Sequence, residues 1–469
     1  MTGQGESLTW NLPHRPLAES FEFFYFQLFL VCIVGFLFYF LEYAQLMNAF
    51  IFAAALFGLV YPGRVMEGFV LLMALNHRDF AYTTLMIHGA NIYITEWVLL
   101  ILLAAAAPKA VFVIRRYRIP AFALLTYFLV GFVLFLMSFR AWPLYYALRD
   151  FSLVYYSFFA VVALAHVQGV AGARRIGIAL VLGTVPNLVA EGLNYLYGTL
   201  PLTIEQKNYS MRNSFYYAAS IGFLLAFVID EGGKWEKPLI AYVMSAAFVI
   251  LLYSYSKTPM LALLLLGATY CYRRRKVMRW KEAAVLGAMV IIPLTFTPIT
   301  KTFHFTGLFI PATYLHDSRA LLHILAVRDF VEYPYGIGFG ASIFGNNAHM
   351  VIENPEQIGS LHNSYLVILR RLGLEGGLVF FLILALAFYK ALVAYQRSMV
   401  LRDKMMVLGI LGAWAATAVF AAAHVALEGP FFGAVFWILL GTLFVTAGET
   451  EELSDAPGKT YSLAPGAGA

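Results

Sequence analysis

Long apolar segments recur along the chain and are separated by short polar stretches. A helix that crosses the hydrocarbon core of a bilayer, about 30 Å thick, needs about 20 mostly apolar residues. Segments of about this length predict transmembrane helices at residues 21–40, 44–61, 65–80, 92–113, 120–139, 150–168, 176–197, 213–229, 238–253, 258–272, 282–298, 372–390, 405–424 and 430–447. The third and tenth are short and could be re-entrant or tilted, so the pattern predicts an all-α polytopic membrane bundle of about 12–14 helices.

The spacing of these segments divides the chain into four parts. Residues 1–298 and 372–447 hold the N-terminal and C-terminal transmembrane helices. Residues 299–371 form the largest loop, in which prolines, glycines and polar groups mix with aromatic residues, and we expect surface helices within it. The tail at 448–469 contains many small residues and is expected to be disordered. Because long ordered loops are usually functional, the loop at 299–371 is where we expect the site.

Composition supports the membrane assignment and excludes other classes. Of 469 residues, 61% are hydrophobic and 12% are charged, whereas soluble domains carry about 25% charged residues. The formal net charge is +6, but the basic residues fall in short clusters between apolar segments, which is typical of cytoplasmic loops. Nucleic acid is therefore not an expected partner. The two cysteines, Cys32 and Cys271, indicate neither a disulfide framework nor a cysteine metal site.

Four basic clusters predict the orientation of the helices. They lie at Arg115–Arg118, Arg174–Arg175, Arg273–Lys276 and Lys390–Lys404. When the helices are threaded alternately, all four clusters fall on one side, which the positive-inside rule makes cytoplasmic. Both termini then lie in the cytoplasm, and the large loop lies outside.

His362 is the candidate catalytic residue. It lies in Leu361–Leu366, where a loop ends at a predicted helix N-terminus that Asn363 or Ser364 could cap. A histidine placed there can be held firmly and still reach an aqueous cavity. The alternative is a histidine that only anchors the helix at the interface. No pair of histidines has a compact metal-binding spacing, so we expect no metal site.

Cations on the outer side are candidate ligands for an anionic substrate. Lys257 lies at the outer mouth between two helices, and Arg319 lies in the large loop. Charges near apolar surface are costly unless they are partnered, and a phosphate would supply the partner. Each could instead be a solvated or snorkelling side chain. Weaker candidates on the same side are Arg78, Arg140, Arg149, Lys207, Arg212 and Arg328.

Two features near the end of the loop carry local predictions. Arg370 and Arg371 lie too close to His362 for a span that starts there, so we expect the span to start near Leu372. Residues 362–371 would form an amphipathic surface helix, with Arg371 and Glu375 spaced for an i,i+4 contact.

Glycines before and after this segment should permit close approach of the backbone. Gly373, Gly376 and Gly377 would allow packing against a neighbouring helix. The run Gly336–Gly340 has no preceding strand, so it is not a dinucleotide fingerprint and would permit a tight turn near the site.

Several stretches together resemble one family. They are Ser318-Arg319, Glu332–Gly340, His362–Leu366 and Leu372–Gly376, with Ser256–Thr258 similar to an upstream Ser-Arg element. They resemble the core of the O-antigen ligase and O-antigen polymerase superfamily, which consists of polytopic glycosyltransferases of the bacterial inner membrane. Lysine replaces the usual arginine at 257, and Arg371 is more basic than the pattern leads us to expect.

The resemblance implies an inverting transferase that takes glycan from an undecaprenyl-pyrophosphate-linked donor at the periplasmic face, with no cofactor. His362 would be the general base, and Lys257 and Arg319 would bind the pyrophosphate. Apart from the resemblance, the sequence itself offers Asn363, Arg328 and Arg212 as further candidates for substrate binding.

The acceptor decides among the alternatives. We favour an O-antigen ligase that acts on lipid A core over an O-antigen or exopolysaccharide polymerase that uses a second lipid-linked glycan. A transporter or flippase for polysaccharide or lipid-linked sugar is the main alternative from another class, and it would place ionisable groups near the bilayer midplane. A peptidoglycan-type polymerase and a structural or sensory membrane protein are weaker alternatives.

Overall fold

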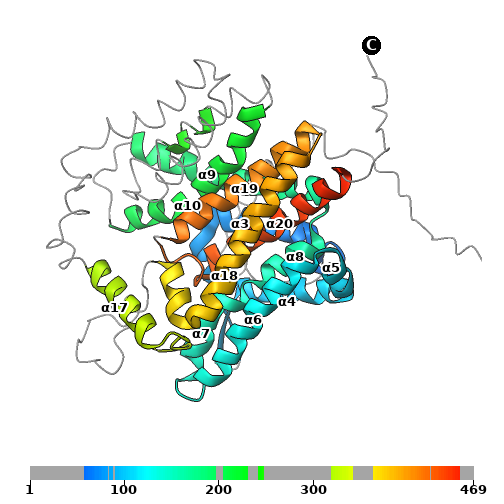
Figure 1. Ribbon diagram of the computed structural model, residues 1–469. Coiled ribbons are helices and arrows are strands. Elements are labelled where there is room, and N and C mark those ends of the chain that lie inside the picture. Colours follow the sequence, from blue (N-terminus) through cyan, green and yellow to red (C-terminus); the bar gives the residue numbers. More distant parts are fainter. Residues whose placement is uncertain are drawn as a thin grey trace, which may run out of the picture. The chain divides into compact units, whose positions relative to one another are not determined.

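The computed structural model describes residues 57–82, 84–87, 90–196, 204–230, 241–243, 245–247, 318–341, 363–422 and 424–454. These residues are mostly helical, as the apolar pattern predicts (Figure 1). The expected helices at 21–40, 258–272 and 282–298 lie outside the described residues, as does most of the one at 44–61, so the total number of spans stays a prediction.

The described elements follow in chain order. Those before residue 231 are α3 (Pro62–Tyr82), β1 (Thr84–Ile87), β2 (Ala90–Tyr93), α4 (Ile94–Ala106), η1 (Ala107–Lys109), α5 (Ala110–Arg116), α6 (Arg118–Ser138), α7 (Leu144–Tyr155), α8 (Phe158–His166), α9 (Gly169–Leu196) and α10 (Ile204–Asp230). Those after residue 317 are α17 (Ser318–Glu332), α18 (Ser364–Arg397), α19 (Leu401–Ala421) and α20 (Pro430–Ser454).

Seven helical segments in the described part are long and apolar enough to cross a bilayer. They are Ile94–Arg116, Arg118–Ser138, Leu144–His166, Gly169–Ala190, Ser364–Arg397, Leu401–Ala421 and Pro430–Glu451. Two of them combine shorter helices, since α4 continues through η1 into α5, and α7 is followed closely by α8. The multi-pass membrane character that the composition predicts is confirmed.

Helix α20 occupies the centre of the bundle. It packs against α8, α18 and α19, and 94% of its most apolar 18-residue stretch is buried. A helix that is apolar on all sides can be buried in this way. Helix α6 is the opposite case. Only 22% of its most apolar 18-residue stretch is buried, and Phe122, Leu129 and Met137 point outward. Exposed apolar side chains along a whole helix are expected where lipid is the solvent.

Glycines allow the helices to approach closely. A Cβ atom added to Gly441 of α20 would lie 2.5 Å from the carbonyl oxygen of Ala160 in α8, and one added to Gly183 of α9 would lie 2.5 Å from that of Leu71 in α3. Without a hydrophobic drive between helices in lipid, such close backbone contacts supply much of the packing energy.

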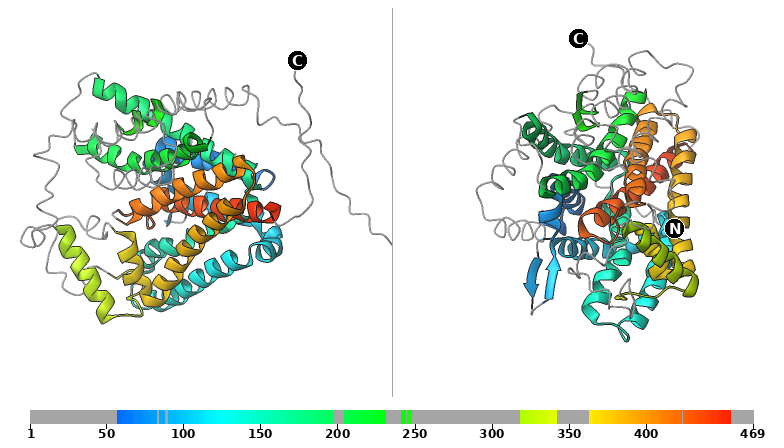
Figure 2. Two further views of the ribbon diagram at one scale, coloured as in Figure 1. Left: turned by 45° about the horizontal axis from the view of Figure 1, so that its top comes forward. Right: turned by 90° about the vertical axis from the view of Figure 1, so that its left-hand side faces the viewer.

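A short antiparallel hairpin departs from the all-α expectation. Strands β1 and β2 pair with Thr84 opposite Tyr93 and Ile87 opposite Ala90, and they appear as two arrows in the right-hand view of Figure 2. The helix that was expected from residue 92 begins instead at Ile94. Threonine, isoleucine and tyrosine favour extended backbone, and a four-residue pairing is too short for an apolar pattern to reveal.

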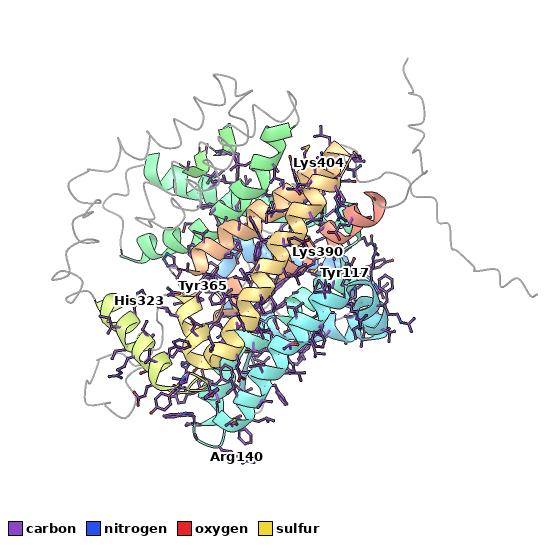
Figure 3. The ribbon with its side chains drawn as sticks, viewed as in Figure 1. Tyr117, Arg140, His323, Tyr365, Lys390 and Lys404 are labelled. Atoms are coloured by element: carbon purple, nitrogen blue, oxygen red, sulfur yellow. The ribbon has the colours of Figure 1, made fainter. Side chains whose placement is uncertain are left out.

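The basic clusters gather at one end of the bundle. Arg175 pairs with Glu67 at 2.6 Å, and Lys390 pairs with Glu451 at 2.7 Å. A Cβ atom added to Gly448 of α20 would lie 3.2 Å from the Tyr117 ring, which brings the start of α6 to the same end. In Figure 3 Lys404 is labelled near the top of the bundle, and Lys390 is labelled beside Tyr117. Three of the four clusters thus lie together as predicted, and the fourth, Arg273–Lys276, lies outside the described residues.

We predict that the two ends of the bundle face opposite sides of the membrane. In a background with Cys32 and Cys271 changed to Ser, Tyr335→Cys should react with a membrane-impermeant maleimide on intact spheroplasts. Met399→Cys should react only after lysis. Both positions suit the assay because Tyr335 is 75% and Met399 94% exposed. Equal labelling of both variants before lysis would contradict the predicted orientation.

Candidate functional site

The end opposite the basic clusters contains the start of α18, where the sequence places the His-Asn-Ser-Tyr stretch. The Asn363 side-chain oxygen accepts hydrogen bonds from the backbone nitrogens of Tyr365 and Leu366, both at 3.1 Å. Asn363 is therefore the N-cap, one of the two residues that the sequence offered for this role. Its oxygen is engaged by the helix, so any substrate contact by this side chain falls to its amide nitrogen.

Ser364 ties the start of α18 to the segment between α19 and α20. Its hydroxyl donates to the carbonyl of His424 at 3.1 Å and accepts from the backbone nitrogens of Ala426 at 2.9 Å and Leu427 at 3.1 Å. The serine is fully buried. Buried backbone groups in a loop need such partners, so this hydroxyl fixes the two segments together.

Helix α18 is broken at Gly373, whose φ of 64° and ψ of −164° are not helical. The break confirms that a short helical segment ends near Leu372 and that a longer helix follows it. The start of the membrane span at this point stays a prediction. The loop after α17 fills the break: Leu374 N donates to Pro334 O at 2.7 Å, and Ile337 N donates to Arg370 O at 3.0 Å. Backbone groups freed by the break therefore find partners in this loop.

The glycine run forms the tight turn that was predicted. Gly336, Gly338 and Gly340 all have positive φ, at 89°, 74° and 84°. Between them, Phe339 N donates to the Ser138 hydroxyl at 2.8 Å, and the Gly340 N–H donates to the Asp150 carboxylate at 2.9 Å. A Cβ atom on Gly336 would lie 2.6 Å from Gly373 N, so both conformation and space require glycine there.

Arg370 and Arg371 were expected on the polar face of an amphipathic surface helix. They are instead buried in ion pairs. Arg370 Nε lies 2.8 Å from the Asp329 carboxylate, and Arg371 Nη2 lies 2.5 Å from the Asp150 carboxylate. Their exposed fractions are 2% and 5%. The expected Arg371–Glu375 contact is wrong because the break at Gly373 destroys the i,i+4 geometry, and Glu375 is exposed.

The expected role of the next two glycines also needs correction. The nearest atoms to an added Cβ on Gly376 belong to Leu372, and on Gly377 to Leu369. Both leucines belong to the segment of α18 before the break. These glycines therefore make room for that segment of their own helix, and the expected packing against another helix is not what they provide.

Glu428 adds a carboxyl group to this charged cluster. Its backbone carbonyl accepts a hydrogen bond from the Ser152 hydroxyl at 2.9 Å. Its Oε1 atom is buried and has no hydrogen-bond partner among the described residues. Burial, followed by the negative charge of Asp150, raises the pKa of Glu428 to about 8, although nearby arginines including Arg371 oppose the shift. The carboxyl group therefore holds its proton at neutral pH.

The described residues include only part of the predicted site. His362 and Lys257 lie outside them, and Arg319 in α17 and Arg212 in α10 are described only in their backbone. Arg328 lies exposed on α17, with Nη2 at 3.4 Å from the carboxylate of its neighbour Asp329. The convergence of His362, Lys257 and Arg319 in one cavity stays a prediction.

The residues that organise this end include several that the sequence did not single out. They are Asp150, Asp329, Ser138 and, as a cluster member, Glu428. One signal in the sequence was available. A tandem Arg370-Arg371 beside apolar helix requires acidic partners, and Asp150 and Asp329 each follow an arginine near a predicted loop.

No family model matches this chain, and no curated protein matches it. The helical membrane architecture and the charged cluster around α18 therefore carry the functional argument.

We predict that removal of one partner of the Arg371–Asp150 pair strongly destabilises the protein. Arg371→Met leaves the Asp150 carboxylate buried without its cation, and loss of one member of a buried pair costs about 3–5 kcal/mol. Thermal unfolding in detergent should shift down by several degrees. The double variant Arg371→Met with Asp150→Asn should recover part of the loss. A double variant as unstable as the sum of the two single variants would contradict a direct pairing.

We also predict that stability depends on the protonation of Glu428. The pKa of this carboxyl is raised from its usual 4.5 to about 8, so its favourable contribution is complete below pH about 4.5 and is lost as the pH rises through about 8. Glu428→Gln keeps the neutral form. Its unfolding temperature should exceed that of the wild type by a few degrees at pH about 9 and match it at pH about 5.

The matched control for this measurement is Glu375→Gln, which removes the same charge from an exposed position. It should leave the dependence of unfolding temperature on pH unchanged. Parallel curves for Glu428→Gln and the wild type would show that the Glu428 carboxyl does not titrate as described.

Proposed function

We propose that this chain is an inverting glycosyltransferase of the bacterial inner membrane. It transfers glycan from an undecaprenyl-pyrophosphate donor to a hydroxyl of lipid A core at the periplasmic face, as an O-antigen ligase does. The observation that supports this proposal best is the firm anchoring of the helix start that directly follows His362.

A general base needs a fixed position relative to the hydroxyl from which it takes a proton. The residue after His362 is the N-cap of α18, and the next residue, Ser364, is bonded to three backbone groups of residues 424–427. Seven residues further along, Arg371 is locked by Asp150. These contacts make the helix start a rigid support for a base, and an unperturbed histidine pKa of about 6.5 suits that role at neutral pH.

The donor chemistry explains why the support belongs to a membrane bundle. A polyprenyl carrier keeps the glycan at the bilayer surface, so the transferase must meet it among apolar helices. In the proposal Lys257 and Arg319 bind the pyrophosphate and stabilise the charge that develops as it leaves. Arg328 lies on the same helix as Arg319 and has an exposed guanidinium group.

The acidic residues of the described part fit an enzyme better than a transporter. Glu67 lies in the second turn of α3 and is paired with Arg64 and Arg175. Glu96 lies in the first turn of α4, where its carboxylate accepts hydrogen bonds from two tyrosines. Glu428 lies between α19 and α20. Glu67 and Glu428 are near helix ends, whereas transporters place ionisable groups near the bilayer midplane. Glu96 is the exception, because its tyrosine partners lie in the middle of the span Leu144–His166.

We predict that His362→Ala abolishes glycan transfer. Purified full-length protein in nanodiscs would receive undecaprenyl-pyrophosphate oligosaccharide and lipid A core, and the product would be followed by gel shift. Loss of a general base should lower the rate by roughly 10²–10⁴-fold. The matched control is His323→Ala, on α17, which should stay within about threefold of the wild type because this histidine has no part in proton transfer. Retained transfer by His362→Ala would exclude the catalytic role.

The choice of acceptor is tested in the same assay. Lipid A core and a second lipid-linked glycan would be offered together to the wild-type protein. Capped lipid A core supports the ligase. A ladder of lengthened lipid-linked glycan that forms without lipid A core would replace the ligase with a polymerase.

A further inference from the structure

Three arginines at the end opposite the basic clusters point outward and lack strong partners. Arg140 follows α6, is exposed, and makes no ion pair or hydrogen bond in the described part of the chain. Figure 3 labels it beyond the end of α6. Arg149 of α7 and Arg328 of α17 have side chains that are 48% and 57% exposed.

The acids beside these arginines are already engaged. The Asp150 oxygen Oδ2 binds Arg371 and the Gly340 N–H, so Arg149 reaches only Oδ1, at 3.5 Å. The Asp329 oxygen Oδ2 binds Arg370, and Arg328 reaches only Oδ1, at 3.4 Å. Exposed pairs of this length contribute little stability. Arg149 also lies over the Tyr146 ring, with 5.5 Å between its Cζ atom and the ring centroid. The charge of Arg140, Arg149 and Arg328 is therefore balanced by no close, buried acid in the described part of the chain.

Exposed aromatic residues accompany these arginines on the same two segments. The α6–α7 turn and the loop after α17 are joined by the hydrogen bond from Phe339 N to Ser138, and an added Cβ on Gly340 would lie 2.9 Å from the Trp142 side chain. We call this surface the tyrosine–arginine rim. Its members are Phe139, Arg140, Tyr145, Tyr146, Arg149, Arg328, Tyr333 and Tyr335.

The rim adjoins the ends of two candidate spans. Arg140 follows the span Arg118–Ser138 by two residues, and Arg149 is in the second turn of the span that begins at Leu144. Tyrosines are enriched at the membrane–water interface, where their hydroxyl groups meet the head groups. Arginines are uncommon on the outer side, and their fork of donors matches phosphate oxygens.

We propose that the tyrosine–arginine rim binds the phosphate groups of a glycolipid in the outer leaflet, and that this glycolipid is the acceptor. The identity of the ligand as acceptor rests on the proposed function. The charge favours a lipid with several phosphates, as lipid A has, because three exposed guanidinium groups lie on the segments that the Phe339–Ser138 hydrogen bond joins. The donor pyrophosphate is left to Lys257 and Arg319.

The test measures lipid retention without any glycan transfer. Full-length protein in detergent would be titrated with lipid A, phosphatidylglycerol or phosphatidylethanolamine and analysed by native mass spectrometry. The variant Arg140→Gln, Arg149→Gln, Arg328→Gln should lose roughly 100-fold in affinity for lipid A, and Arg140→Gln alone about fivefold. The control variant Arg115→Gln, Arg118→Gln, Arg397→Gln removes the same charge from exposed positions at the other end and should lose less than about twofold.

The outcomes separate the possible sources of phosphate. A loss confined to lipid A supports the proposal. An equal loss for phosphatidylglycerol would overturn it in favour of general anionic lipid binding, and displacement of lipid A by millimolar inorganic phosphate would overturn it in favour of a free-phosphate site. An equal loss in the control variant would also overturn it. The single variant Arg140→Gln keeps the test valid if the triple variant does not fold, because Arg140 supports no described contact.

The proposal and the proposed function can fail separately. If the wild-type protein retains lipid A through the rim but transfers no glycan, the transferase proposal fails and the lipid site stands. If the triple variant retains lipid A and still transfers glycan to it at the wild-type rate, the rim proposal fails and the transferase stands.

Discussion

Two buried ion pairs determine the arrangement of the end that holds α18. Arg370 and Arg371 are adjacent in sequence, yet they pair with Asp329 of α17 and Asp150 of α7, two helices far apart in the chain. Desolvation of four charged groups is unfavourable unless each pair has good geometry and further hydrogen bonds. The glycine loop supplies such bonds: Gly340 N donates to Asp150, and the Gly338 carbonyl accepts from Arg371. The loop and the ion pairs therefore depend on each other.

The break in α18 follows from the same constraint. In a continuous helix through Gly373, the backbone N–H and C=O groups near this residue would bond to one another within the helix. None of them would then be available to the loop after α17. Because Gly373 adopts a positive φ, its neighbours can bond to Pro334 and to residues 337 and 338. In lipid, a broken helix is tolerated only where other protein groups satisfy the freed backbone. The loop after α17 provides those groups, so the break becomes a fixed junction between the short buried segment Ser364–Leu372 and the long helix that follows it.

Local sequence predicted the seven candidate spans of the described part but not the charged cluster, and the spans expected at 65–80 and 213–229 are not among those seven. The apolar run at 120–139 predicted α6, which spans Arg118–Ser138, and the run at 430–447 predicted α20, which begins at Pro430. The arginines at 370 and 371 correctly predicted a helix boundary, because charge is costly in lipid. The side chains nevertheless turned inward, since their partners lie 41 residues away at Asp329 and more than 200 away at Asp150, beyond any local pattern.

Burial divides the arginines of this end into two chemical roles. A guanidinium group that is nearly inaccessible, such as that of Arg371, has exchanged water for fixed protein oxygens and cannot rearrange around a ligand without breaking the α18 junction. An exposed one, such as that of Arg140, keeps its hydration and can exchange water for phosphate at little structural cost. Arg371 and Arg370 bind the Asp150 and Asp329 carboxylates closely, so the exposed Arg149 and Arg328 make only long contacts with these acids. The contacts that make the junction rigid are thus the same contacts that leave positive charge on the surface around it.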